Sequence, residues 1–438
     1  MNLTIDKEKV LNDLGKVDYV KHYGKVSKIV GLTIESIGPL AQMNEICKIT
    51  TMNGQEVLAE VVGFKDNNLL LMPLGDMAGI GINDKVEALG KPLEVKIDDS
   101  LLGRVVDGLG NVFDDLGELE LHDTITVQND APNALERTRI SESLHLGVKA
   151  IDGTITIGKG QRIGIFAGSG VGKSTLMGMI ARNALSDINV IALIGERGRE
   201  VKEFIERDLG PEGLKRSIVV VATSDTPSLI RQKAAYVATA IAEYFRSKGK
   251  DVMLMLDSLT RFAMATREIG LAIGEPPVSK GYTPSVYTTI PKLLERAGTD
   301  KQGSITGIYT VLVEGDDMNE PVADTARGVL DGHIVLDRKL AYKNHYPAID
   351  VLASISRLMS EVATPEHKEL AKKLRNVLAT YSEAEDLINV GAYSKGSNPD
   401  IDYAITKIKS VNAFLQQETT ENYSYTEMLE EMSNIFLD

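Results

Sequence analysis

A glycine-rich stretch in the middle of the chain holds the residues whose types and spacing best suit a defined chemistry. Residues 167–175 read AGSGVGKST. The glycines allow a tight turn whose backbone N–H groups point at phosphate oxygens. A lysine there supplies charge to the β- and γ-phosphates, and the hydroxyl residue after it binds Mg²⁺. The residues predicted to bind nucleotide here are Gly168, Ser169, Gly170, Val171, Gly172, Lys173, Ser174 and Thr175.

This loop differs from the usual phosphate-binding pattern in having Ala167 at the position of the first Gly. A strand–helix turn that is merely rich in glycine is the alternative. The apolar run Arg162–Phe166 before the loop predicts a buried strand, and a helix is expected to begin near Lys173. The positive end of that helix dipole favours a bound anion, so we favour the nucleotide site.

An acid at the end of an apolar run is a second candidate. Residues 251–257 read DVMLMLD, which predicts a strand ending at Asp257. Ligands bind at the carboxyl ends of strands in parallel sheets, so Asp257 would hold Mg²⁺ directly or through water, together with Ser174. The alternative is an Asp that caps the following helix. With a phosphate loop in the same chain, we favour the metal role.

A charged cluster, GERGRE, follows the strand that ends at Ile194. Hydrolysis needs a carboxylate that orients and deprotonates water, and Glu196 at a strand end is placed for this. Arg197 beside it would contact phosphate. Taken alone, the cluster is more often a solvated start of a helix.

Two further stretches are weaker candidates. Tyr346, before Pro347, would stack on adenine, and Arg357 would reach a nucleotide on a neighbouring subunit as an arginine finger. In isolation a packed loop tyrosine and a surface arginine are the commoner interpretations. The loop 274–284, with Lys280, would line a pore or a subunit joint, or would be an ordinary connector.

The elements around these residues alternate between strand and helix. Apolar runs predict strands at 162–166, 188–194, 217–223, 251–257 and 304–313, and 228–248 forms a long amphipathic helix pattern. Such alternation predicts an α/β fold with a parallel sheet covered on both faces. From about 350 onward the pattern is mostly helical.

The N-terminal part of the chain has a different character. Within 22–92, short β-rich runs alternate with turns, including the hairpin signal Asn53-Gly54. Strands at this spacing predict a small closed barrel. Before them, Val10, Leu14 and Val17 recur at helical spacing, as in either a frayed first helix or a docking helix.

Composition limits the function classes. A chain of 438 residues exceeds one ordinary domain, and 43% hydrophobic with 25% charged residues is typical of globular proteins. The net charge of −14 argues against a general nucleic-acid binder. The single cysteine, Cys47, excludes an internal disulfide. We find no signal peptide and no apolar run long enough to span a bilayer.

Taken together, these motifs resemble a known family. Residues 167–175, 195–200, 256–261 and 354–357, with the 275–284 loop, look like the rotary-ATPase group of RecA-type P-loop enzymes. Within that group, LDSLTRFAMATREIGLAIGEPP at 256–277 and DTARGVLDGHIVL at 324–336 are similar to the flagellar protein-export ATPases and their type III secretion relatives.

The resemblance implies a domain plan. Residues 1–21 would be a helical segment for docking a partner, 22–92 a β-barrel and 93–349 a RecA-like ATPase domain. Residues 350–438 would form a C-terminal helical domain. Subunits would form a hexameric ring with ATP at each subunit joint.

The resemblance also implies roles for single residues. Lys173 and Ser174 would bind phosphate and Mg²⁺, and Glu196 would activate water. Arg197 and Arg261 would hold phosphate or order the site. Tyr346 would pack on adenine, and Arg357 would act in the neighbour's site.

The implied activity is hydrolysis of Mg-ATP to energise protein export, with substrates and chaperones unfolded or released at a membrane gate. The protein would be cytoplasmic and peripherally attached to the inner face of the membrane. A stator-like regulatory protein would bind residues 1–21, and export-gate membrane proteins would be partners.

Two rival functions share the same core. One is a catalytic subunit of a proton-translocating rotary ATP synthase, against which the 256–277 stretch and the short C-terminal domain argue. The other is a hexameric RNA or DNA translocase, which would need a basic, aromatic face on the barrel. Residues 22–92 contain only Tyr23 and Phe64 as aromatics, with no dense Lys/Arg cluster, so no nucleic-acid partner is expected.

Overall fold

The computed structural model describes residues 22–437 apart from 314 and 316, in two compact units. The first unit ends at Leu93, and the second begins at Glu94. The helix expected within residues 1–21 lies outside the described residues.

The first unit is a closed barrel with strand order β1-β2-β5-β4-β3-β6, which confirms the predicted small barrel. Its core contains Val26, Ile34, Cys47 and Leu71, all fully or almost fully buried. Burial raises the pKa of the Cys47 thiol to about 12, so this side chain acts as an apolar core residue. The strands are β1 (Tyr23–Val30), β2 (Thr33–Ile37), β3 (Glu45–Thr50), β4 (Glu56–Lys65), β5 (Asn68–Pro73) and β6 (Lys85–Pro92).

The second unit is built on a nine-stranded sheet with order β19-β18-β12-β17-β15-β13-β14-β8, in which β16 pairs with β17. The strands from β18 to β8 run parallel, whereas β19 is antiparallel to β18. The sheet strands are β8 (Val105–Asp107), β12 (Arg162–Ala167), β13 (Ile188–Ile194), β14 (Ser217–Ala222), β15 (Asp251–Asp257), β16 (Gly298–Thr299), β17 (Ser304–Leu312), β18 (Gly332–Leu336) and β19 (Ile349–Ser356). This confirms the predicted parallel sheet.

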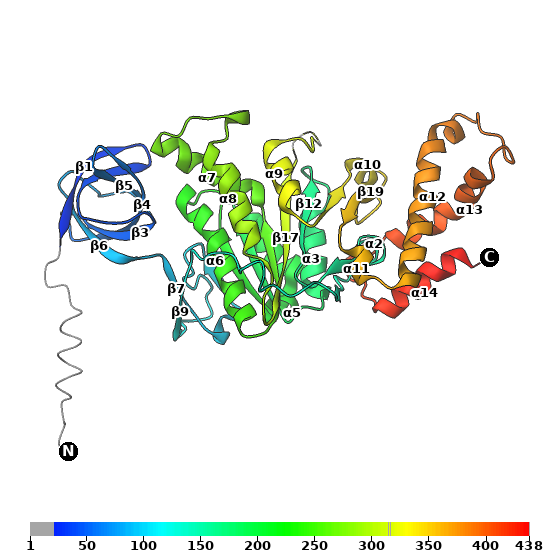
Figure 1. Ribbon diagram of the computed structural model, residues 1–438, viewed down its shortest axis with the longest axis horizontal. Helices are drawn as coiled ribbons and strands as arrows, with labels where there is room; N and C mark the ends of the chain where they lie inside the picture. Colours follow the sequence, from blue (N-terminus) through cyan, green and yellow to red (C-terminus); the bar gives the residue numbers. More distant parts are fainter. Residues whose placement is uncertain (1–21, 314, 316, 438) are drawn as a thin grey trace, which may run out of the picture. The chain divides into compact units, whose positions relative to one another are not determined.

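Helices cover the sheet because almost every residue of its inner strands is apolar and buried. Alternate residues of one strand, such as Ile163 and Ile165, join a core with Leu176 and Met179 of helix α3. Helix α6 packs on β13, β14 and β15, and α7 packs on α6 and β17 (Figure 1).

The helices of this unit are α2 (Lys149–Thr154), α3 (Lys173–Asn183), α4 (Gly198–Glu203), α5 (Gly210–Lys215), α6 (Ser228–Ser247), α7 (Leu259–Ile273), α8 (Pro284–Glu295), α9 (Pro321–Val329), α10 (Arg338–Tyr342), α11 (Met359–Val362), α12 (Pro365–Asn389), α13 (Pro399–Leu415) and α14 (Tyr425–Phe436). Single 3₁₀ turns are η1 (Asp99–Leu101) and η3 (Ser279–Gly281), and η2 (Phe204–Leu209) is a short π-helix after α4. Two small ladders pair β7 (Glu94–Ile97) with β9 (Asp123–Thr126), and β10 (Ser143–Leu144) with β11 (Ile157–Gly158).

Strand β19 falls beyond the predicted start of the helical region at 350. Its eight residues pair with β18, so the sheet continues to Ser356 and the helices begin at Met359. Only part of each face of β19 is buried. Its residues therefore do not alternate regularly between buried and exposed, and the periodicity of the sequence did not predict this strand. The helices α12, α13 and α14 then pack on each other and on α2 (Figure 1).

The parallel strands of the sheet all begin along one side and end along the opposite side. We call the side of the strand ends the carboxyl edge and the side of the strand starts the amino edge. The carboxyl edge carries the ends of β12, β13, β15 and β17, and it is where β19 begins, since Ile349 pairs with Leu336 and Leu336 with Ala167. The amino edge carries the start of β12 and the end of β19, since Ser356 pairs with Gly332. Within the described part of the chain, no helix is both long and apolar enough to cross a bilayer.

Candidate active site

The predicted phosphate loop connects β12 to α3 at the carboxyl edge. Gly170 and Gly172 have φ values of +80° and +91°, which only glycine adopts without strain. Gly172 is the N-cap of α3, and no side chain caps the helix there. The first N–H groups of α3 therefore remain available to an anion at the end of the helix.

Lys173 meets two carboxylates at this edge. Its Nζ contacts Asp257 Oδ1, and it lies 3.8 Å from Glu196 Oε1. Asp257 is the last residue of β15 and Glu196 follows β13, so parallel strands deliver both acids to one place. The structure thus brings together three of the predicted site residues. All three side chains are less than one-fifth exposed.

Thr310 completes this group. Its hydroxyl donates to Asp257 Oδ1 at 2.6 Å, from the neighbouring strand β17. Sequence reasoning did not single out Thr310. A hydroxyl residue near the end of a strand expected beside the one carrying Asp257 is the signal that would have found it.

Glu196 has an altered acidity. Burial raises the pKa of its carboxyl to about 7, nearby Lys173 opposes this rise, and the charges of Asp257 and Glu200 add to it. A carboxylate with a pKa near neutrality is a stronger base than an exposed one, while still ionised at physiological pH to a large extent. The geometry and the acidity both suit proton abstraction from water.

The alternative role for Asp257, a cap of the next helix, is not what the structure shows. Ser258 is the N-cap of α7, and its hydroxyl accepts from the Arg261 N–H at 3.2 Å. Asp257 is thereby left with Lys173 and Thr310 as its described partners.

Arg261 lies beside the residue that precedes Glu196. A Cβ placed on Gly195 would lie 3.0 Å from the aliphatic carbons of Arg261, and Gly195 has a φ of +68°. The Arg261 Nε is buried without a hydrogen-bond partner in the described structure. A side chain at 195 would push the Arg261 stem away by a few tenths of an ångström, and the positive φ of this residue also favours glycine.

Arg197 is placed differently from Glu196. Its guanidinium is 82% exposed and pairs with Glu200 at 3.2 Å, at the start of α4. The structure therefore brings Arg197 to the same loop as Glu196 but turns its side chain to solvent.

A cavity of about 740 Å³ adjoins the phosphate loop. Tyr346 forms one wall, and a Cβ on Gly172 would lie 3.5 Å from its ring. Residues from the segment between α13 and α14 form another wall, which sequence reasoning missed because they lie far along the chain from Tyr346. The lining comprises Gly172, Thr175, Leu176, Met179, Asn344, Tyr346, Pro347, Ala413, Gln416, Gln417, Glu418, Thr419 and Glu421.

Arg357 lies at the other end of β19 from Tyr346. The eight residues of β19 span roughly 25 Å at the usual rise per strand residue. Arg357 is exposed, and its N–H donates to the Asp331 carbonyl at the amino edge. No carboxylate within the described ranges forms an ion pair with its guanidinium.

The residues present fit a magnesium ion that arrives with nucleotide. Ser174 offers an exposed hydroxyl in the first turn of α3, and Asp257 offers carboxylate oxygens. In the described part of the chain, no group of three or more His, Cys, Asp or Glu side chains could hold a metal alone. Mg²⁺ commonly binds through one or two protein oxygens plus phosphates and water, which matches this set.

Comparisons with known proteins agree with this architecture. Residues 147–356 match the nucleotide-binding domain of the ATP synthase alpha/beta family, and 26–90 match the beta-barrel domain of the same family. Residues 363–434 match the T3SS EscN ATPase C-terminal domain.

Individual relatives match along almost their whole length. The chain is 55% identical to the flagellum-specific ATP synthase of Bacillus subtilis (strain 168), covering 94% of this chain and 95% of the relative. It is 50% identical to the type 3 secretion system ATPase of Xanthomonas euvesicatoria, covering 95% and 94%.

Among solved structures, the chain is similar to the assembled ATPase EscN from the enteropathogenic E. coli type III secretion system. The TM-score is 0.89 at 45% identity, covering 94% of this chain and 99% of EscN. A second structure, of EscN in complex with its central stalk EscO, gives a TM-score of 0.87 at 44% identity. The chain therefore belongs to the flagellum-specific and type 3 secretion ATPases of the ATP synthase alpha/beta family, and it is an ATP-hydrolysing enzyme of type III protein export.

Proposed function

We propose that Lys173, Glu196 and Asp257 form the hydrolytic centre of this export ATPase, completed by Arg357 of a neighbouring subunit. The observation that carries the proposal is the split between the two edges of the sheet. Lys173, Glu196 and Asp257 converge at the carboxyl edge, while Arg357 stands at the amino edge.

In this proposal the phosphate loop binds the β- and γ-phosphates through its backbone N–H groups and Lys173. Binding the phosphates draws Lys173 away from Asp257, which frees that carboxylate. Ser174, and Asp257 directly or through water, would hold Mg²⁺, which neutralises phosphate charge when bound.

Glu196 then takes a proton from the attacking water. Its pKa of about 7 lets it accept that proton while being ionised in a large fraction of molecules. Arg261, packed against Gly195, would keep the Glu196 loop in place. Arg197 would turn from solvent toward phosphate when nucleotide binds.

Tyr346 would stack on adenine in the cavity beside the phosphate loop. The ring stands next to Gly172 and is 42% exposed, so a base can cover it. The wall from the segment between α13 and α14 would close the other side of the base.

Arg357 acts on the neighbour because it cannot reach its own phosphate loop. The length of β19 separates it from the carboxyl edge of its own subunit. A guanidinium contributed across a subunit joint neutralises charge on the transferring phosphoryl group and is worth roughly a thousandfold or more in rate. This arrangement implies a ring, for which we propose a homohexamer.

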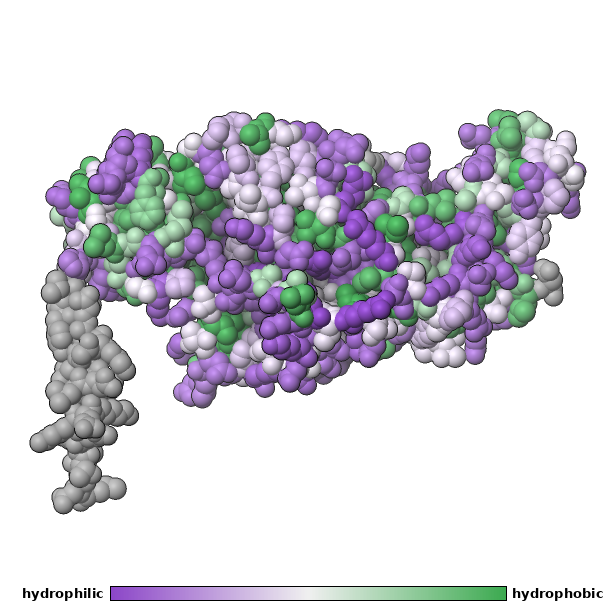
Figure 2. Space-filling model, viewed as in Figure 1, coloured by the Kyte–Doolittle hydropathy of each residue, from purple (hydrophilic) through white to green (hydrophobic). Residues whose placement is uncertain are grey.

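The barrel surface supports an assembly rather than a nucleic-acid site. Figure 2 shows apolar residues at the surface of the barrel, and Ile37, Leu40 and Met43 are at least half exposed. Apolar surface of this kind suits packing between copies, whereas a translocase would present basic and aromatic groups.

We further propose that the ring works on flagellar export substrates and their chaperones at a membrane export gate. The 55% identity to the flagellum-specific ATP synthase of Bacillus subtilis supports the flagellar role. The ring would be attached peripherally to the membrane, with a stator-like regulator bound to residues 1–21.

The test of the trans role is a mixing experiment. Arg357→Ala and Lys173→Ala proteins should each be inactive, and mixing them should restore hydrolysis. At some subunit interfaces of a mixed ring, one subunit contributes an intact phosphate loop and its neighbour contributes an intact Arg357. Because the test needs subunit exchange, light scattering on the same sample must show that rings form.

Mixed rings that stay as inactive as either parent would contradict the trans role. Specific activity should also rise with protein concentration as rings assemble. Activity per mole that stays constant while the monomer fraction changes would argue against the need for assembly.

A further inference from the structure

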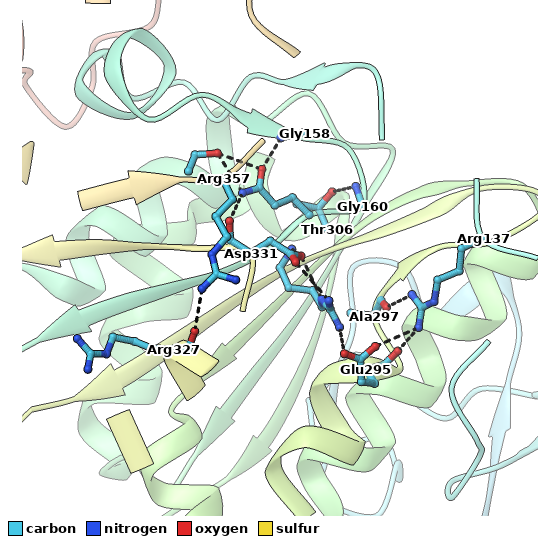
Figure 3. Close-up of polar contacts among 12 residues, drawn as sticks. Arg137, Gly158, Gly160, Glu295, Ala297, Thr306, Arg327, Asp331 and Arg357 are labelled. Atoms are coloured by element: carbon cyan, nitrogen blue, oxygen red, sulfur yellow. Dashed lines mark hydrogen bonds and ion pairs between the residues drawn. The ribbon is translucent and has the colours of Figure 1, made fainter. Parts of the chain in front are cut away.

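The backbone of Arg357 is held by hydrogen bonding at the amino edge of the sheet. Its N–H donates to the Asp331 carbonyl at 3.0 Å, and one guanidinium nitrogen lies 3.5 Å from the Arg327 carbonyl (Figure 3). The rest of the side chain is exposed. The direction in which Arg357 extends is therefore set by what holds the main chain at 331 and 356.

Gln161 holds both of these points with one side chain. It is fully buried, directly before β12. Its Nε2 donates to the Asp331 carbonyl at 3.1 Å and to Ser356 Oγ at 3.0 Å. Its Oε1 accepts from the Gly158 N–H at 2.9 Å, which fixes the orientation of the amide.

The Asp331 side chain is held by Arg162, the residue after Gln161. Its Oδ2 accepts from the Arg162 N–H at 3.0 Å and from Arg162 Nε at 3.1 Å. Arg162 also pairs with Glu295 at 2.6 Å. Arg137 contacts Glu295 in turn (Figure 3). The Asp331 carbonyl that holds Arg357 is thus connected to the body of the sheet through ion pairs among these charged groups.

We propose that Gln161 is a positioning residue for the trans-acting Arg357. The proposal rests on the trans role proposed above. Gln161 ties the strand before Arg357, and the carbonyl that accepts from Arg357, to the start of β12. Loss of its two donated hydrogen bonds would let the end of β19 shift relative to the sheet.

A shift of this kind would cost rate without weakening nucleotide binding. Misplacement of a catalytic group by about 1 Å can lower a rate about a hundredfold. The phosphate loop and the Tyr346 cavity lie at the other edge, so the KM for ATP should change by less than about twofold. We expect Gln161→Glu, which keeps the acceptor to Gly158 but turns the donor into an acceptor, to lower kcat by about tenfold or more.

Mixing the Gln161→Glu protein with two different variants distinguishes a misplaced Arg357 from damage to the phosphate loop of the Gln161→Glu subunit itself. A Gln161→Glu subunit with an intact phosphate loop should regain activity with Lys173→Ala, which supplies a well-placed Arg357. It should gain nothing with Arg357→Ala, since neither subunit then supplies one. If the substitution harms its own phosphate loop through β12, the two outcomes reverse.

Ser356→Ala is the second variant, and it tests the same contact if Gln161→Glu fails to fold. It removes only the hydroxyl that accepts from Gln161 Nε2 at 3.0 Å and donates to Gln161 Oε1 at 3.4 Å. It should show a smaller loss of kcat and the same mixing pattern. Wild-type activity in both variants, or the reversed pattern in either, overturns the proposal. No gain in the parent mixture of Arg357→Ala and Lys173→Ala overturns the trans role itself, and the positioning role with it. A gain in that mixture but none with Gln161→Glu overturns the positioning role alone.

Discussion

The two edges of the central sheet use charged residues in opposite ways. At the carboxyl edge one cation, Lys173, faces both Asp257 and Glu196, and the pKa of Glu196 is raised. At the amino edge two cations, Arg162 and Arg137, pair with two carboxylates, Asp331 and Glu295, so the charges are matched in number. The first arrangement leaves acid–base capacity for a reaction, whereas the second holds a framework in place.

Strand β19 links the two edges. Tyr346 precedes it at the carboxyl edge, and Arg357 follows it at the amino edge. In the proposed mechanism, β19 thus carries an aromatic side chain for its own subunit's nucleotide at one end and a guanidinium for a neighbouring subunit at the other. The comparison predicts that substitutions at the carboxyl edge act within a subunit and those at the amino edge act across a joint.

The largest effect is expected from Lys173→Ala. Without this charge the γ-phosphate loses its main cationic partner from its own subunit, and hydrolysis should fall by about ten-thousandfold or more. Turnover and the thermal midpoint should be measured together, with Lys202→Ala as a control, since Lys202 is 74% exposed on α4. Near-normal turnover in a folded Lys173→Ala protein would remove the phosphate loop from the mechanism.

Glu196→Gln comes next. The amide keeps the size of the side chain but cannot accept a proton from water, so kcat should fall by about a hundredfold to a thousandfold. Binding of Mg-ATP should persist, because the carboxylate acts in the transition state. Nucleotide binding by fluorescence, alongside turnover, is the measurement. A variant that loses binding and turnover together would make Glu196 a structural residue.

The carboxyl edge was largely predictable from sequence, and the amino edge was not. Glycines, a lysine and strand-ending acids mark the carboxyl edge through local patterns, because parallel strands end together there. Arg357 was predicted as a trans-acting residue through a resemblance, but its anchors were not. Gln161 belongs to no motif, and Asp331 lies in the 324–336 stretch, where the resemblance gave it no role. Their contacts join segments 170 and 195 residues apart.

The same limit applies to the nucleotide cavity. Tyr346 was predicted, whereas Gln416 and Gln417 were not, because the turn that brings them to the cavity lies after two long helices. Strand β19 was hidden by its mixed pattern of buried and exposed residues. Hydrophobic periodicity indicates a strand when one of its faces is buried and the other is exposed. It does not identify a strand that is partly buried on both faces.

A smaller effect is expected from pH. The pKa of Glu196 is raised to about 7, so below that pH the carboxyl is protonated and cannot accept a proton from water. The value of kcat/KM should therefore rise by about tenfold from pH 6 to pH 8 and level off above. The residual activity of Glu196→Gln should lack this rise. A flat profile in the unsubstituted enzyme would mean that another step limits the rate or that Glu196 is not the base.

The smallest effect is expected at Tyr346. Base–aromatic stacking is worth about 1–3 kcal/mol by alanine substitution, so Tyr346→Ala should raise the KM for ATP by about five- to tenfold, at the low end because this ring is partly exposed. The phosphates are held by a separate loop, so kcat should stay within about twofold. Tyr346→Phe is the matched control, since it keeps the ring and removes only the hydroxyl, and its KM should match that of the unsubstituted enzyme. A fall in kcat with unchanged KM would instead mean that Tyr346 positions β19. A shift at the start of this strand would then displace Arg357 at its end. Mixing Tyr346→Ala with Lys173→Ala distinguishes the two, since a base-binding defect stays with the subunit that carries it, whereas a displaced Arg357 is corrected by a neighbour.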